Sequence, residues 1–470
     1  MPSLPLASIR ARLDSDRTPP LVARSFLENV RRWGSGDLGV IPGRHLSPIG
    51  PLPKLSDLDE LDPAGEEAIR RTVVIKLNGG LGTGMGLDKA KSLIVAKNGL
   101  TFLDILVRQI EFLRRRCRAP LPFLLMDSFS TDADSLASIA ANHPGFANPD
   151  GLPLSFLQHR VPKLVAETAE PVTWPDNPQL EWCPPGHADI YLALQTTGLL
   201  DRLLASGYRH AFVSNSDNLG AILHMGILGF VARRRIPFLM EVTARTECDR
   251  KGGHLARDRA SGRLLLRESA QCPADETEDF QDIAKYSLFN TNNLWIDLEA
   301  LRDALAAYDG LLSLPLIVNR KTVDPVRPDS TPVVQLESAM GAAISCFEGA
   351  TALVVPRRRF APVKTTNDLL AVRSDLYRLG EDHQVTLHPQ RFAPPPDIRL
   401  DPRYCKHIAD FELRFPNGAP SLLYCDSLTV EGDIRFGRDV RVEGDVHLRN
   451  PTDRPATIPD GIRLHTPIAR

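Results

Sequence analysis

Apolar positions follow different patterns along the chain, and the first change falls near residue 70. Before it, helical segments lead into a proline-rich stretch, and proline interrupts a continuous helix. After it, short β-branched apolar runs such as Val73–Leu77 and Ala211–Ser214 alternate with segments of helical period such as Phe102–Arg116. Strands that alternate with helices are typical of βαβ units and a mainly parallel sheet. The pattern therefore predicts an α/β domain that follows an N-terminal arm.

The last part of the chain has a period of six instead. The sequence VEGDI at 430–434 recurs as VEGDV at 442–446, and apolar residues form two interleaved series with a spacing of six. The two series are Leu428, Ile434, Val440 and Val446, and Val430, Phe436, Val442 and Leu448. This period is the signature of a hexapeptide β-helix, although alternation alone also fits a hairpin meander. We favour the β-helix because both series hold along the whole segment.

Proline-rich stretches divide the chain into three predicted regions. Residues 1–70 form a helical arm and a proline-rich segment, residues 71–390 form the α/β domain, and residues 391–470 form a linker and a short β-helix. The second boundary falls at Pro389 and Pro394–Pro396. A short β-helix has exposed ends, so we expect it to pack on the main domain or on another subunit.

Composition and charge narrow the class of protein. The 470 residues include 56 Lys and Arg against 58 Asp and Glu, a formal net charge of -2, and so balanced a chain does not predict a nucleic-acid partner. The most apolar uncharged stretch, 218–232, is shorter than the roughly 20 residues that span a membrane. The seven Cys show neither a disulfide framework nor a zinc spacing, which favours a reduced compartment. We therefore expect a cytoplasmic protein with no membrane or nucleic-acid partner.

The strongest chemical signal is the segment 73–94, VVIKLNGGLGTGMGLDKAKSLI. An apolar strand runs into a loop with five glycines within eight residues, followed by Lys89 and Lys91. Glycine lets main-chain N–H groups approach an anion, and a lysine beyond the loop adds a charge for phosphate. Neither GxGxxG nor GxxxxGK[ST] fits, because other residues stand where each pattern requires glycine. The loop therefore predicts a nucleotide-phosphate site of a third kind, and the alternative is a flexible turn with solvated lysines.

A second group of polar residues ends another predicted strand. Asn215, Ser216 and Asp217 follow an apolar run. Ligands of parallel sheets bind beyond the carboxyl ends of the strands, where Asp217 would meet a Mg²⁺-bound phosphate. A single aspartate at a strand end is more often a turn or helix-capping residue, so this motif gains weight only beside the glycine loop.

Three further loops have the polar character of binding segments. PPGHAD at 184–189 precedes a predicted helix, and NTNN at 290–293 lies inside an apolar stretch. Each also has a structural interpretation, as a helix cap and as a turn. In PRRRFAPVKTTNDL at 356–369, the run Arg357–Arg359 is interpreted as a solvated face, whereas Lys364 is the better candidate for a directed charge.

Together these segments resemble the eukaryotic-type UTP–glucose-1-phosphate uridylyltransferases, also called UDP-glucose pyrophosphorylases. The motifs that carry the resemblance occur in one order over roughly residues 70–450: KLNGGLGTGMG with KSLI, LMDSFSTD, PPGHADIY, SNSDNLGA, MEVT, KGGHL, FNTNNLWI, QLESAMGAAI and PVKTTNDLL. The resemblance implies an α/β fold, with a GT-A-like, Rossmann-type mixed-sheet core and a C-terminal left-handed parallel β-helix. It also implies reversible formation of UDP-glucose and pyrophosphate from UTP and glucose 1-phosphate, with Mg²⁺.

The resemblance assigns roles residue by residue. Lys91, Lys364 and Asp217 are implied as catalytic, with Asp217 as the metal ligand. The implied nucleotide-binding residues are Leu77, Asn78, Gly79, Gly80, Lys91, Gln158, Gly186, Asn215, Ser216, Asp217 and Lys364. The implied sugar-phosphate-binding residues are His187, Asn292, Gly252 and Gly253.

The residue types suit this chemistry, because the nucleophile is already a phosphate oxygen of the sugar phosphate and needs no strong general base. Such a site must align two polyanions and offset charge as pyrophosphate leaves, which is a matter of positioning and electrostatics. Three residues depart from the usual family pattern. Ala188 replaces a glycine, Asp127 stands where many members carry Asn, and Lys89 stands where a small residue is common.

Three alternatives remain open from the sequence. A UDP-sugar pyrophosphorylase with another or broader sugar range would share these motifs, because sugar epimers differ by one hydroxyl position. A GT-A glycosyltransferase would need a DxD metal motif, and Asp132-Ala133-Asp134 more readily forms an acidic first helical turn. The third alternative is a non-catalytic UDP-sugar sensor. The oligomeric state is open between a monomer and a homo-oligomer formed through the C-terminal β-helix.

Overall fold

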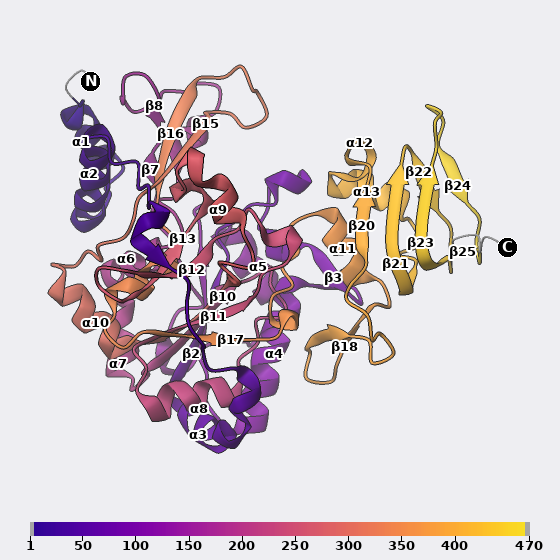
Figure 1. Ribbon diagram of the computed structural model, residues 1–470, viewed down its shortest axis with the longest axis horizontal. Helices are drawn as coiled ribbons and strands as arrows, with labels where there is room; N and C mark the ends of the chain where they lie inside the picture. The colour runs from indigo at the N-terminus through magenta and orange to yellow at the C-terminus, as the bar shows by residue number, and fades with distance from the viewer. Residues whose placement is uncertain (1–3, 466–470) are drawn as a thin grey trace.

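The computed structural model describes residues 4–465 (Figure 1). The chain begins with an arm of two helices, α1 (Leu6–Ser15) and α2 (Pro20–Gly34). Phe26, Val30 and Trp33 recur at helical spacing on α2 and are buried, so this face packs inward. It lies against a three-stranded antiparallel sheet whose strands are β8 (Leu164–Val165), β15 (Ile317–Thr322) and β16 (Pro332–Glu337).

A 10-stranded mixed sheet forms the centre of the molecule, so the expected α/β class is confirmed. Strands β10, β2, β5 and β6 are parallel neighbours, and β14 runs antiparallel beside β10 and β11. The apolar pattern, which predicted a mainly parallel sheet, missed β14 because its polar centre, NTNN, interrupts the run. The bounds are β1 (Leu46–Ser47), β2 (Thr72–Leu77), β5 (Phe123–Asp127), β6 (Ser155–Leu157), β10 (His210–Asn215), β11 (Phe238–Ala244), β12 (His254–Asp258), β13 (Leu264–Arg267), β14 (Leu288–Asp297) and β17 (Thr351–Val354).

Helices cover both faces of this sheet, because alternate residues of each central strand point to opposite sides (Figure 1). On β2, Val74 packs into one apolar core, while Val73 and Ile75 pack into the other. The first core includes α4 and α8, and the second includes α6, α7 and α10. The bounds are α4 (Phe102–Cys117), α6 (Asp189–Thr196), α7 (Leu199–Ala205), α8 (Met225–Arg234) and α10 (Leu298–Ala307).

The C-terminal part projects from one end of this core (Figure 1). Its main sheet has parallel strands in the order β20, β21, β23 and β25, and β22 and β24 form a second parallel pair. Leu428 pairs with Val446, so the chain returns to the same register after three hexapeptide steps. The bounds are β20 (Asp397–Leu400), β21 (Ser421–Glu431), β22 (Ile434–Phe436), β23 (Arg441–Arg449), β24 (Ala456–Ile458) and β25 (Arg463–His465).

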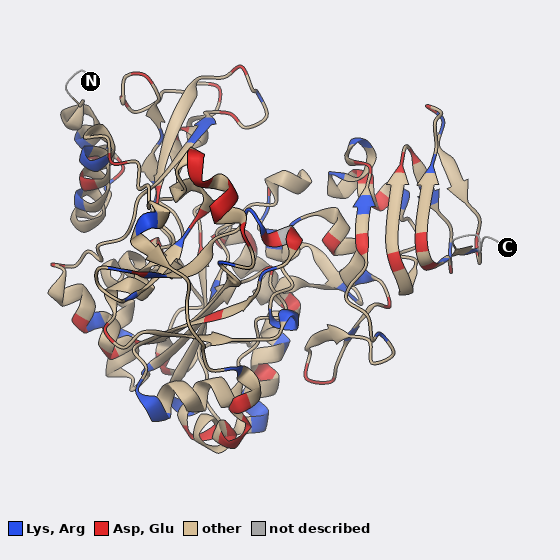
Figure 2. Cartoon of the chain, viewed as in Figure 1, with Lys and Arg blue, Asp and Glu red and all other residues tan. Residues whose placement is uncertain are grey.

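The surface carries both signs of charge. Lys and Arg are interspersed with Asp and Glu over the outer helices and the C-terminal strands (Figure 2), in keeping with the formal net charge of -2. Among residues 4–465, no helix is both long enough and apolar enough to cross a membrane. The cysteines whose side chains are described carry free thiols, as their scattered spacing predicts.

Candidate active site

The carboxyl end of β2 leads directly into the first group of predicted site residues. Leu77 closes the strand, and Asn78 is buried at its end, where Nδ2 donates to Oδ1 of Asp127 at 2.7 Å. A Cβ at Gly79 would lie 2.5 Å from Nε2 of Gln158, so a larger residue would displace that amide. Gln158 follows β6, and its backbone N–H donates to the carbonyl oxygen of Asp127 at 2.8 Å. Asn78, Gly79 and Gln158 thus meet at neighbouring strand ends.

The glycine loop that follows folds back on itself. The main-chain N–H of Lys91 donates to the carbonyl oxygen of Gly80 at 3.2 Å, which places Lys91 beside the start of the loop. A Cβ at Gly80 or Gly84 would meet no atom within 4 Å, so these faces of the backbone are open to a ligand. Within this described stretch only Gly86 has a left-handed φ, of +75°, and it packs on the ring of His407. The glycines therefore serve mainly close approach.

A buried carboxylate on the neighbouring strand holds Asn78. Asp127 Oδ1 accepts hydrogen bonds from Asn78 Nδ2, Thr131 Oγ1 and Ser135 Oγ at 2.7, 3.0 and 3.3 Å. Its Oδ2 is buried without a hydrogen-bond partner. Burial raises the pKa of Asp127 to about 6. Asp127, where many family members carry Asn, therefore places a titratable group next to the glycine loop.

Lys91 and Asp217 meet at the centre of the site. Lys91 Nζ lies 2.7 Å from Asp217 Oδ2, and both side chains are 17% exposed. Ser216 is buried beside them, and its N–H donates to the carbonyl oxygen of Leu77 at 3.1 Å. Asn215 pairs with Leu77 in the parallel register of β10 and β2. The parallel register therefore places the polar end of β10 beside the start of the glycine loop.

The second carboxylate oxygen of Asp217 is a candidate metal ligand. Asp217 Oδ1 is buried and has no hydrogen-bond partner. Mg²⁺ commonly binds through one or two carboxylates together with substrate phosphates. Within residues 4–465, no group of three or more His, Cys, Asp or Glu is arranged to hold a metal without substrate. Asp217 therefore fits a divalent ion that it would hold jointly with phosphate oxygens.

The turn PPGHAD carries His187 just before α6. Gly186 has a φ of +91°, and a Cβ there would lie 2.4 Å from the carbonyl oxygen of Ser338, so the turn requires glycine. His187 Nδ1 accepts from the N–H of Met340 at 2.9 Å, so the neutral ring carries its proton on Nε2. Burial lowers the pKa of His187 to about 4, which keeps the ring neutral at pH 7. The ring therefore presents an N–H donor at Nε2 and carries no charge.

A pocket of about 810 Å³ adjoins the Asp217 loop and is lined by Gly252, Phe289 and Lys364. Val363 also lines it, and the N–H of Val363 donates to the carbonyl oxygen of Asp217 at 3.2 Å. The side chain of Lys364 is exposed. The predicted sugar-side glycine and the predicted phosphate-directed lysine therefore share one pocket.

Glu268 is a further candidate, and the sequence did not indicate it. A Cβ at Gly253 would lie 2.5 Å from Glu268 Oε2, so this carboxylate lies against the glycine. Burial raises the pKa of Glu268, and the Lys364 ammonium opposes that shift. Glu268 thus lies against Gly253 and within electrostatic range of Lys364, two residues of the predicted site.

The NTNN segment lies in the middle of β14. Asn292 has a left-handed φ of 58°, and its N–H donates to Oδ1 of Asn290 at 2.9 Å. Asn290 Nδ2 donates in turn to Asn292 Oδ1 at 2.9 Å. A Cβ at Gly341, which follows the partner of His187, would lie 3.0 Å from Asn290 Nδ2. The segment Met340-Gly341 therefore contacts both the His187 turn and the Asn290–Asn292 pair.

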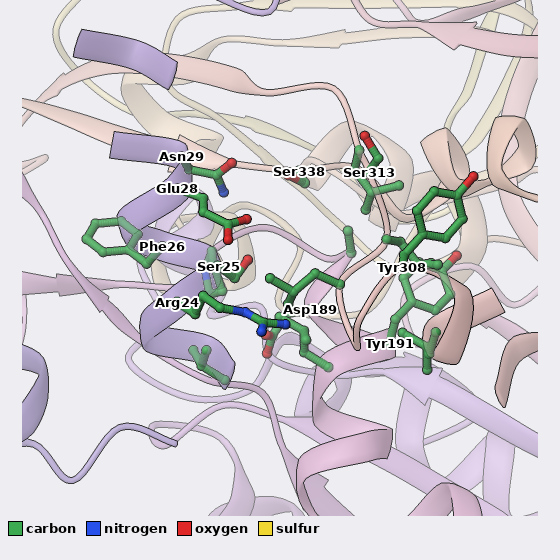
Figure 3. A pocket seen from close by; sticks show the side chains of 18 of the residues that line it. Arg24, Ser25, Phe26, Glu28, Asn29, Asp189, Tyr191, Tyr308, Ser313 and Ser338 are labelled. Atoms are coloured by element: carbon green, nitrogen blue, oxygen red, sulfur yellow. The ribbon is translucent and has the colours of Figure 1, made fainter. Parts of the chain in front are cut away.

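A separate cavity of about 350 Å³ borders the His187 turn from the side of α2 (Figure 3). Arg24 extends from α2 toward Asp189, while Tyr191 and Tyr308 lie on the opposite wall. Its described lining includes neither lysine of the site and no part of the glycine loop. Of the two cavities, only the larger one is lined by a lysine of the predicted site, Lys364.

One interpretation from the sequence is wrong in part. The run Arg357–Arg359 was expected to be a solvated face, but Arg359 is buried and pairs with Glu241. Arg357 is exposed but pairs with Asp249, with Nη1 and Oδ2 2.6 Å apart. Arg357 and Arg358 thus have the expected exposed position, and Arg359 does not.

Known proteins are similar to this chain in sequence and fold. A family model described as UTP–glucose-1-phosphate uridylyltransferase matches residues 45–443. The UTP–glucose-1-phosphate uridylyltransferase of Solanum tuberosum is 42% identical over 444 residues, covering 93% of this chain and 90% of that protein. That of Saccharomyces cerevisiae is 40% identical over 403 residues, covering 85% of this chain and 78% of that protein. Among solved structures, a mutant UDP-glucose pyrophosphorylase from Leishmania major in complex with UDP-glucose has a TM-score of 0.90 at 42% identity and covers 99% of both chains.

The family model spans residues 45–443, a range that includes the glycine loop, Asp217 and Lys364. The agreement in fold extends over nearly the whole length. This chain therefore belongs to the UTP–glucose-1-phosphate uridylyltransferase family.

Proposed function

We propose that this chain forms UDP-glucose and pyrophosphate reversibly from UTP and glucose 1-phosphate. The observation that carries the proposal is the Lys91–Asp217 contact, 2.7 Å between Nζ and Oδ2, at the junction of the glycine loop and the Lys364 pocket. A cation beside a carboxylate with one free oxygen suits a metal-bound triphosphate. The relatives bear the name of the same activity, which supports these substrates.

We assign UTP to the residues around the end of β2. The backbone of the glycine loop would face the phosphates, and the side-chain amide of Gln158 would face the uridine. Gly186 shapes the turn on the opposite side through its left-handed backbone. The full proposed set is Leu77, Asn78, Gly79, Gly80, Lys91, Gln158, Gly186, Asn215, Ser216, Asp217 and Lys364.

We assign glucose 1-phosphate to the pocket beside Lys364. His187 would donate from Nε2, and Asn292 would offer an amide to a sugar hydroxyl. Gly252 and Gly253 leave room where a Cβ would meet Phe289 and Glu268. We add Glu268 to this set as an acceptor for sugar hydroxyls.

The reaction in this geometry is an in-line displacement. An oxygen of the sugar phosphate attacks the α-phosphorus of UTP, and the bond from that phosphorus to the pyrophosphate oxygen breaks on the opposite side. Lys91 and Lys364 reduce the repulsion between the two anions and orient them, so the protein acts by positioning and electrostatics. A divalent ion held by Asp217 would supply charge for the departing pyrophosphate. No proton has to move at the reacting oxygen.

The proposal also covers the metal ion, the location, the three regions of the chain and the oligomeric state. We propose Mg²⁺ as the divalent ion and the cytoplasm as the location. We also propose the regions 1–70, 71–390 and 391–470 as arm, catalytic domain, and linker with a left-handed β-helix. The pairing of Leu428 with Val446 supports coils of three hexapeptides. Monomer and homo-oligomer through this β-helix both remain proposals.

The alternatives gain no support from the comparisons. A broader sugar range and a non-catalytic sensor each rest on the sequence motifs alone, whereas the named relatives are glucose-1-phosphate enzymes. A glycosyltransferase would release UDP and not pyrophosphate.

The test is pyrophosphate release by the purified protein with Mg²⁺, UTP and glucose 1-phosphate. Galactose 1-phosphate and ATP would replace each substrate in turn. We expect release with UTP and glucose 1-phosphate and much less with either replacement. A folded protein that binds UTP and releases no pyrophosphate with any pair would contradict the proposal.

A further inference from the structure

Glu241 is a buried carboxylate with four hydrogen-bond donors around it. It lies in the middle of β11 and its side chain is fully buried. Arg359 donates to it twice, from Nε at 2.7 Å and from Nη2 at 2.6 Å. Trp295 Nε1 and Asn293 Nδ2 complete the set at 2.9 and 3.1 Å. A bidentate pair with every oxygen satisfied fixes both residues more rigidly than an exposed ion pair does.

The backbone around Arg359 is fastened to the loop that carries Asp217. The carbonyl oxygen of Arg359 accepts from Asn218 Nδ2 at 3.1 Å. Asn218 Oδ1 accepts from the N–H of Ala361 at 3.1 Å. Two residues further on, the N–H of Val363 donates to the carbonyl oxygen of Asp217 at 3.2 Å. The segment therefore runs alongside the Asp217 loop until it reaches Lys364.

The segment that begins at Arg358 and the loop that carries Asp217 are in close backbone contact. A Cβ at Gly220 would lie 2.3 Å from the carbonyl oxygen of Arg358, so the approach depends on glycine. Arg359 Nη2 also donates to the carbonyl oxygen of Ile222 at 2.9 Å, which binds the far end of the same loop. One guanidinium thus holds the sheet at Glu241 and the loop at Ile222.

We propose that Glu241 and Arg359 are positioning residues for uridylyl transfer, which set where Lys364 stands relative to Asp217. This inference rests on the function proposed above. Neither residue touches substrate in this account. Glu241 anchors Arg359, Arg359 anchors the segment 359–363 to Asn218 and Asp217, and that segment delivers Lys364.

The test compares three variants by thermal melting, UTP binding by calorimetry, and kcat with saturating UTP, glucose 1-phosphate and Mg²⁺. Arg359→Lys keeps the charge but loses the bidentate geometry. We expect kcat to fall by about 100-fold, the cost of a misplacement of roughly 1 Å, while UTP affinity stays within about threefold of the parent. Arg358→Ala is the matched control, because Arg358 is the exposed arginine next to Arg359 in the same run. This variant should keep kcat within about twofold.

Asn218→Ala keeps the test decisive if Arg359→Lys does not fold. It leaves the Glu241–Arg359 pair intact and cuts the fastening between the segment and the Asp217 loop. We expect a fall in kcat of about tenfold or more with unchanged UTP affinity. The inference is overturned if folded Arg359→Lys and Asn218→Ala turn over within about twofold of the parent. It is also overturned if kcat and UTP affinity fall together in these two variants.

Failure of the proposed function gives a different result. A parent protein without pyrophosphate release would contradict the proposed function itself. An active parent with equally active Arg359→Lys and Asn218→Ala variants would contradict this inference alone.

Discussion

Two sides of the proposed site are built in different ways. On the glycine-loop side, Asn78, Gly79 and Lys91 come from one stretch that follows β2. On the other side, Asp217 and Lys364 come from segments far apart in the sequence and are joined by backbone hydrogen bonds and a buried ion pair. A loop of sequence neighbours depends on local backbone chemistry, whereas an assembly of distant segments depends on the packing between them. Substitutions on the first side should therefore affect UTP binding, and those on the second should affect turnover.

Apart from the loss of the Asp217 carboxylate, the largest effect is expected for Lys364→Ala. The exposed ammonium has no part in packing the core, so the fold should persist while charge compensation is lost. We expect kcat to fall by about 100- to 1000-fold. Lys89→Ala is the matched control, since Lys89 is an exposed lysine of the glycine loop to which no substrate role is given. Steady-state pyrophosphate release would measure the turnover of both variants. Equal rates for Lys364→Ala and Lys89→Ala would contradict a specific role of Lys364 in turnover.

Asp127→Asn is expected to change the free energy of unfolding on the glycine-loop side of the site. Burial raises the pKa of Asp127 to about 6 from its ordinary value of 3.8, so the folded protein disfavours the ionised form. The contribution of Asp127 to the free energy of unfolding of the parent is therefore most favourable at low pH. It is lost as the pH rises from the pKa of the unfolded state to that of the folded state. Asn removes this loss and keeps an acceptor for Asn78, so the variant should gain up to about 3 kcal/mol at pH 8.

Urea unfolding at pH 8 and pH 4.5 would measure this difference. The gain should shrink at the lower pH, where the parent carboxyl is largely protonated. Asp134→Asn, an exposed change of the same kind in α5 (Asp132–Asn142), is the control. A gain of equal size at both pH values would show that titration of Asp127 is not its cause.

The smallest effect is expected for Gly79→Ala. The new Cβ would lie 2.5 Å from Gln158 Nε2, and the flexible amide has to move away from the uridine position. We expect the KM for UTP to rise about tenfold, close to 1.4 kcal/mol, with little change in kcat. Gly50→Ala is the control because its Cβ would also meet no atom within 4 Å and Gly50 lies outside the glycine loop. A fall in kcat with an unchanged KM would place Gly79 on the other side of the comparison.

The same contrast explains what could be predicted from the sequence. The α/β class, the glycine loop and the strand-end Asp217 follow from patterns a few residues long, and their family resemblance extends this to His187 and Lys364. Glu268 and the Glu241–Arg359 pair leave no local pattern. In the run Arg357–Arg359, three identical residues occupy a surface ion pair, an open exposed position and a buried ion pair. Long-range packing alone separates them, so only the structure identifies the third.

Asp217→Asn provides the most direct measurement of the central claim, which is uridylyl transfer at the Lys91–Asp217 junction. Pyrophosphate release and UTP binding would be measured on the same preparation with Mg²⁺, UTP and glucose 1-phosphate. We predict that kcat falls by about 1000-fold, since the carboxylate that would hold the metal is lost, while UTP still binds through the glycine loop. Turnover close to that of the parent would contradict the account.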